Sequence, residues 1–144
     1  MIDNRTAAYG LLVLRVGLGA LALSHGLTKL LVFTPAGTVG FFQSLGYPAV
    51  AAYYAMAFET LGGLALILGF YPRVAALLQL PILLGATLVH LPNGWMFASP
   101  NGGFEFPLFW AAALLAQVLL GPGAFALRDV GPLGTTTTAT ARTA

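Results

Sequence analysis

The sequence of 144 residues contains no cysteine, and it has only six Lys or Arg and four Asp or Glu residues. Without cysteine the chain has no disulfide bond, no thiolate metal ligand and no thiol nucleophile. A redox role would therefore need a bound cofactor, a quinone or a partner protein. The formal net charge is +2 and the basic residues are scattered, which excludes a nucleic-acid-binding surface.

Hydrophobic residues are abundant instead: they form 58% of the chain, and charged residues only 7%. Soluble domains contain about 25% charged residues, so the composition predicts a membrane protein in contact with lipid. Membrane-spanning helices need about 20 mostly apolar residues. Four segments qualify, at about 8–32, 49–70, 73–91 and 105–121. Charged and polar residues interrupt the first apolar run, which we therefore interpret as a retained helix and not as a signal peptide.

The distribution of basic residues predicts the orientation of these spans. Outside the spans, Lys and Arg occur only at the N-terminus, in the middle loop and after the last span: Arg5, Arg73, Arg128 and Arg142. By the positive-inside rule both termini are predicted to be cytoplasmic. The sequence thus predicts an all-α, integral membrane four-helix bundle over residues 1–130. The polar tail, 131–144, is predicted to be disordered because it has nothing to bury.

Two charged side chains lie deep inside the predicted spans. Glu59 is about ten residues, or about 15 Å, from one end of the second span. Arg15 is about seven residues, or about 10 Å, from the opposite end of the first span. An isolated charge at the bilayer centre costs at least about 2.5 kcal/mol. We therefore predict that Arg15 and Glu59 form a structural ion pair, with a proton or ligand role as the alternative.

A second polar group is predicted at the end of the bundle away from the termini. His25 and Lys29 share one face of the first helix, His90 ends the third span, and Glu105 begins the fourth. Three helices thus bring ionisable groups to one depth, and such interior groups are functional candidates. The prediction is a ligand-binding pocket beneath the 92–104 loop. The alternative is that these residues are merely interfacial, with Lys29 reaching the headgroups and Glu105 favoured at a helix N-terminus.

The order of these residues along the chain resembles that of the DoxX family of small bacterial membrane proteins. The resemblance covers about residues 11–129 and is carried by LRVGLGALALSHGLTKL, FETLGGLALILGFYPRVAALL, LVH, GGFEFPL and GPGAFALRD. It implies a four-span protein of the bacterial inner membrane. The positions that match the family pattern are Arg15, His25, Gly26, Lys29, Glu59, Gly62, Gly63, His90, Glu105, Gly121 and Asp129.

The function that the resemblance implies is a membrane subunit associated with redox chemistry. Some relatives are subunits of quinone-linked oxidoreductases, including thiosulfate:quinone oxidoreductase, and others are membrane partners of oxidative-stress enzymes. A quinone site needs an apolar slot, hydrogen-bond partners for its carbonyls and a group that exchanges protons. His25, His90 and Glu105 are of the right types, with aromatic neighbours at Phe104, Phe106 and Trp95.

Three other functions stay open. Two histidines and a carboxylate could hold iron or haem, but no helix carries the Glu-x-x-His spacing of di-metal bundles. Interior charges also occur in small-solute transporters, although four spans would need a homo-oligomer to provide the room. A non-catalytic scaffold could hold a partner enzyme at the membrane, with residues 38–45 as a short interfacial helix. The sequence leaves open whether the chain is itself an enzyme.

Overall fold

The computed structural model describes residues 6–129, and the predicted disordered tail lies outside this range. Within it the elements are helical, apart from one isolated β-bridge. In chain order they are α1 (Ala7–Leu27), η1 (Thr28–Val32), α2 (Thr34–Ser44), α3 (Ala49–Leu68), α4 (Pro72–His90), η2 (Leu91–Asn93) and α5 (Glu105–Leu120). The prediction of an all-α membrane bundle is confirmed.

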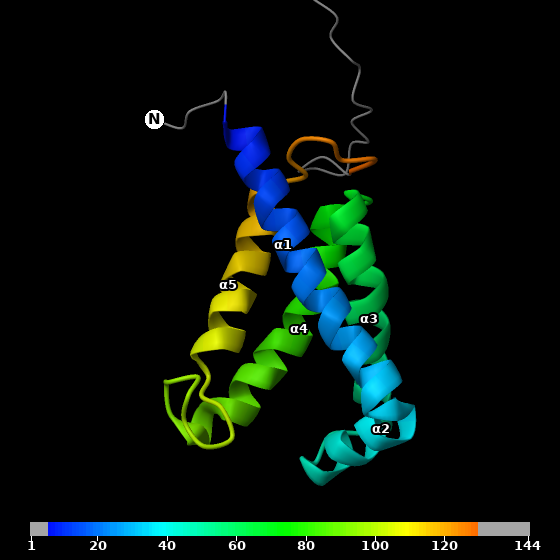
Figure 1. Ribbon diagram of the computed structural model, residues 1–144, viewed down its shortest axis with the longest axis vertical. Coiled ribbons are helices and arrows are strands. Elements are labelled where there is room, and N and C mark those ends of the chain that lie inside the picture. Colours follow the sequence, from blue (N-terminus) through cyan, green and yellow to red (C-terminus); the bar gives the residue numbers. More distant parts are fainter. Residues whose placement is uncertain (1–5, 130–144) are drawn as a thin grey trace, which may run out of the picture.

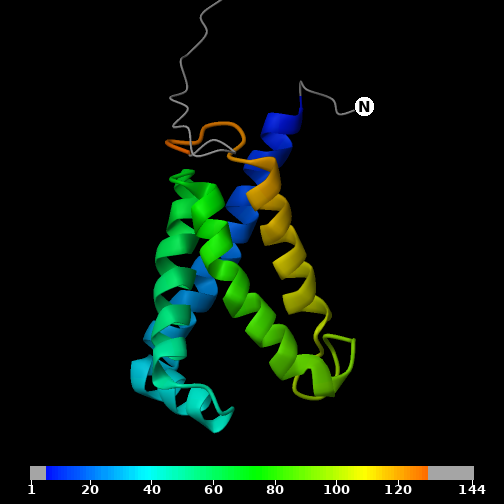
Figure 2. The same ribbon diagram turned by 180° about the vertical axis from the view of Figure 1, so that it is seen from behind.

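The helices form a bundle whose two ends differ (Figures 1 and 2). The first and last described residues lie at the same end, which we call the termini end. Helix α2 and the 92–104 loop lie at the opposite end, which we call the loop end. Towards the loop end, α4 and α5 diverge from α1 and α3 in both views. The side of the membrane that each end faces stays a prediction.

Three helical stretches of the described chain are long and apolar enough to cross a membrane: Ala7–Val32, Ala49–Leu68 and Pro72–Asn93. Helix α5 is also apolar but has only 16 residues, or about 24 Å at 1.5 Å per residue. All four agree closely with the predicted spans. Large apolar side chains on their outer faces, such as Val13 and Phe109, are exposed and therefore contact lipid.

Helices α1 and α3 run antiparallel and pack backbone to backbone through glycines. A Cβ atom at Gly26 would lie 2.7 Å from the Thr60 nitrogen, and one at Gly63 would lie 2.6 Å from the Leu23 nitrogen. Small residues allow such close approach between membrane helices. These contacts set the register of the two helices, because they place Gly26 opposite Thr60.

Residues 121–129, which we call the strap, cover the termini end of α3 and α4 (orange in Figure 1). The Arg128 nitrogen donates to the Gly69 carbonyl at 3.1 Å. The Arg73 Nε donates to Asp129 Oδ2, also at 3.1 Å, in an ion pair that is largely buried. The strap, which follows α5, is therefore fastened onto the turn between α3 and α4.

Candidate functional site

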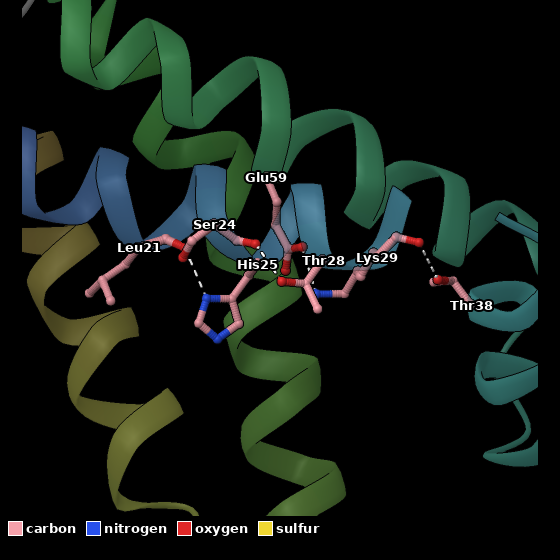
Figure 3. Close-up of polar contacts among 7 residues, drawn as sticks. All are labelled: Leu21, Ser24, His25, Thr28, Lys29, Thr38 and Glu59. Carbon is pink, nitrogen blue, oxygen red and sulfur yellow. Dashed lines mark hydrogen bonds and ion pairs between the residues drawn. The ribbon is translucent and has the colours of Figure 1, made fainter. Parts of the chain in front are cut away.

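Glu59 forms its ion pair with Lys29. The Lys29 Nζ donates to Glu59 Oε2 at 2.6 Å (Figure 3), and the Glu59 side chain is only 5% exposed while that of Lys29 is 19% exposed. The predicted pair between Arg15 and Glu59 is wrong. Lys29, which the sequence assigned to a ligand pocket, is the cation that neutralises the buried carboxylate.

Arg15 lies too far towards the termini end to reach Glu59. Its guanidinium packs against Gly69, which is ten residues beyond Glu59 on the chain, or about 15 Å along a helix. The side chain is 1% exposed, and its Nη2 donates to the carbonyl of Ala124 in the strap at 3.1 Å. Its Nε and Nη1 have no hydrogen-bond partner among residues 6–129. Arg15 therefore joins α1 to the strap.

A π-helical turn, η1, carries Lys29. Its wider spacing is seen in the Phe33 N–H, which donates to the carbonyl of Thr28, five residues earlier, at 3.0 Å. The Lys29 carbonyl accepts a hydrogen bond from the Thr38 hydroxyl of α2 at 3.0 Å (Figure 3). Single π turns insert a residue into a helix and occur frequently at functional sites. Here the turn and the Thr38 contact hold the backbone from which Lys29 reaches Glu59.

Both histidines are oriented by the helix that carries them. The Nδ1 of His25 bonds to the Leu21 carbonyl at 2.9 Å, and the Nδ1 of His90 bonds to the Ala86 carbonyl at 2.8 Å. Because a carbonyl only accepts, Nδ1 is the donor in each ring and carries a proton. The Nε2 atom of each ring is then the one that can accept or exchange a proton with a ligand.

A cavity of about 790 Å³ lies at the loop end, between the diverging helices. It contains Lys29 and Glu59 together with His25 and His90. Most of the remaining wall is apolar or aromatic, including Tyr54, Phe106 and Trp110, and the 92–104 loop contributes Phe97, Gly102 and Gly103. This volume falls within the range of about 300–1,000 Å³ typical of small-molecule sites. Three of the four predicted pocket residues thus share one cavity, and Glu59 joins them.

Glu105 lies outside this cavity. Its Oε1 accepts a hydrogen bond from the Phe97 N–H at 2.6 Å, which ties the loop to the start of α5. Glu105 lines a neighbouring groove of about 850 Å³ instead. Its predicted place beside the other three is therefore corrected, because its carboxylate is directed to the loop backbone.

The groups in the cavity that can react or bind polar ligands are the Lys29–Glu59 ion pair and the imidazoles of His25 and His90, and the rest of the wall is mostly apolar. Lys29 has three N–H donors, and only one is used by Glu59. The pair and the histidines can therefore donate to a ligand oxygen and exchange protons with it. Within residues 6–129, no three His, Cys, Asp or Glu residues are grouped so as to hold a metal ion.

The fold and this cavity define a small multi-pass membrane protein with an ionisable site inside its bundle. The family model described as DoxX matches residues 10–92, and the chain belongs to the DoxX family. It is 35% identical over 114 residues to "Putative oxidoreductase CatD" of Bacillus subtilis (strain 168), covering 78% of this chain and 81% of that protein. It is 30% identical over 124 residues to "Inner membrane protein YphA" of Escherichia coli (strain K12), covering 81% and 86%.

No solved structure shows significant similarity to the chain. The family membership and the membrane-spanning helices confirm the predicted location, a multi-pass protein of the bacterial inner membrane.

Proposed function

We propose that this protein is a membrane subunit or anchor of a redox system and that its cavity binds the head group of a quinone. The observation that carries the proposal is the meeting of the Lys29–Glu59 pair with His25 and His90 in one largely apolar cavity. Interior ionisable residues in a membrane bundle are functional candidates by default, because burying them is costly. The name of the Bacillus relative, "Putative oxidoreductase CatD", agrees with a redox role.

The cavity matches the needs of a quinone ring. Reduction of a quinone adds two electrons and one proton at each of its two carbonyl oxygens. A free N–H of Lys29 can donate to one oxygen, and a histidine Nε2 can exchange a proton with the other. Apolar and aromatic side chains such as Trp110 can pack against the ring. The electrons would come from a partner subunit or a bound cofactor, since without cysteine the chain has no thiol to supply them.

A binding measurement with tail-less quinones tests the proposal. The two Trp residues of the chain are reporters, because Trp110 lines the cavity and Trp95 lines the groove. Menadione and duroquinone should quench the fluorescence of the purified protein saturably. Loss of one hydrogen-bonding group in His90→Ala should weaken binding about tenfold, or about 1.4 kcal/mol.

The matched control for His90→Ala is Leu88→Ala on the same helix, because Leu88 is exposed and lies outside the cavity wall. This variant should bind as the unmodified protein does, and both variants should melt at nearly the same temperature as the unmodified protein. Quenching that never saturates, or equal binding by His90→Ala and Leu88→Ala, would argue against a quinone site here.

A further inference from the structure

A groove of about 850 Å³ adjoins the cavity on the side of α5. Glu105, Leu108, Phe109 and Ala112 form its floor at helical spacing, so they lie along one face of α5. Beyond Glu105 this face is apolar. Phe109 is 74% exposed, which means that the groove opens directly to the surrounding lipid.

The groove adjoins the cavity, because three residues line both: His25, Phe97 and Phe106. The His25 ring packs edge-on against Trp110 at 5.0 Å between ring centroids, so it stands at the boundary of the two spaces. The rings of Phe97 and Phe106 are 6.0 Å apart. Glu105 holds Phe97 in place through its backbone N–H.

We infer that the groove holds the isoprenoid tail of a quinone whose ring occupies the cavity, so that the ligand is a lipid-soluble polyprenyl quinone entering sideways from the membrane. This inference rests on the proposed function and adds the class of quinone to it. In this arrangement the tail would run from a ring at the Lys29–Glu59 pair past His25, which lines both spaces, and along the face of α5 as far as Ala112, which lines the groove. In this proposal Glu105 anchors the 92–104 loop, through Phe97, at the start of the tail path.

The tail's contribution to affinity has a specific physical origin. Lipid is as apolar as the groove, so the tail gains little by leaving the bilayer. It gains close contact with the groove wall. The free energy of this contact is the sum of many weak dispersion interactions. A side chain that fills the groove should therefore weaken binding of tailed quinones without affecting the ring.

Ala112→Phe provides this test. Ala112 is exposed and lines the groove but not the cavity, so an added ring fills the tail path without crowding the core. The matched control is Ala57→Phe, because Ala57 is exposed on α3 and lines neither space. Binding is measured by saturable tryptophan quenching in nanodiscs. Phylloquinone is compared with tail-less menadione, and ubiquinone with tail-less duroquinone.

The expected result is that Ala112→Phe weakens binding of the tailed quinones about tenfold and leaves the tail-less quinones unaffected. Ala57→Phe should change neither. If Ala112→Phe binds tailed quinones as the unmodified protein does, the groove does not hold the tail, and the inference is wrong while the quinone site stands. If the unmodified protein binds neither kind of quinone, the proposed function itself is wrong.

Discussion

Replacing Glu59 with Gln is expected to lower the stability of the protein by about 3–5 kcal/mol, which is typical when one partner of a buried ion pair is removed. The Glu59 side chain is 5% exposed and bonded to Lys29 at 2.6 Å. Its loss leaves the ammonium in an apolar wall without a counter-charge. Lys29→Met should have a similar effect, because it leaves the carboxylate unpaired. Thermal melting of the purified variants in detergent measures both effects.

The double variant Lys29→Met/Glu59→Gln distinguishes this pair from other arrangements. It removes both charges, so it should recover much of the stability that each single variant loses. Adding Arg15→Met to Glu59→Gln should give no such recovery, since Arg15 bonds to Ala124 of the strap instead. Recovery with Arg15→Met, and none with Lys29→Met, would show that the ion pair is assigned to the wrong cation.

Gly26→Ala is expected to separate α1 from α3. The added Cβ would lie 2.7 Å from the Thr60 nitrogen and 3.0 Å from the Glu59 carbonyl carbon. Backbone atoms cannot rotate away, so the helices must move, at a cost of about 1–3 kcal/mol. Lys29 lies less than one turn further along the chain, and the shift should also lengthen its contact with Glu59. Melting temperature reports the first effect, and quinone binding the second.

The control for Gly26→Ala is Gly17→Ala in the same helix. Among the described residues 6–129, no atom beyond the neighbouring backbone of the same helix lies within 4 Å of a Cβ built at Gly17. Alanine is favoured over glycine inside helices by about 0.5–1 kcal/mol, so this variant should be as stable as the unmodified protein or slightly more stable. Equal losses in the two variants would mean that α1 and α3 do not pack through Gly26.

The helices could be predicted from the sequence because their signals are local. Long apolar runs end at Gly, Pro and Asn residues, and the predicted spans lie within about three residues of the observed helices apart from the first, whose last turn is η1. The clustering of His25, Lys29 and His90 was also predictable, since depth along a helix follows from residue count. The first helical stretch, α1 with η1, and helix α4 bring these three residues to one level, where they line the same cavity.

The partner of Glu59 could not be predicted in the same way. Counting residues from the ends of the predicted spans placed Arg15 and Glu59 at similar depths in the membrane. That count assumes that the helices begin at one level and pack without an offset along their axes, which is not generally the case. The true register is set by glycine contacts, which place Gly26 opposite Thr60 and Arg15 against Gly69. The π turn at Lys29 was not predicted either, because the sequence of residues 8–32 predicts one regular helix.

Glu105 shows a different limit. Its position at the start of α5 was predicted correctly, and so was its nearness to the loop end. The direction of its carboxylate depends on the loop backbone, because the carboxylate accepts a hydrogen bond from the Phe97 N–H. Loop conformation of this kind depends on turns and on contacts distant in sequence, which residue types and spacing alone do not specify.

The most direct test of the central claim is the quinone content of the protein as purified from its membrane. Extracted quinones are identified and quantified by mass spectrometry for the unmodified protein and for Lys29→Met/Glu59→Gln, whose folding is checked by thermal melting. We expect the unmodified protein to retain a polyprenyl quinone and the folded double variant to retain on the order of a tenth as much, since it lacks the donor and the carboxylate of the cavity. Equal retention by the two proteins, or none by either, would contradict a quinone site at the Lys29–Glu59 pair.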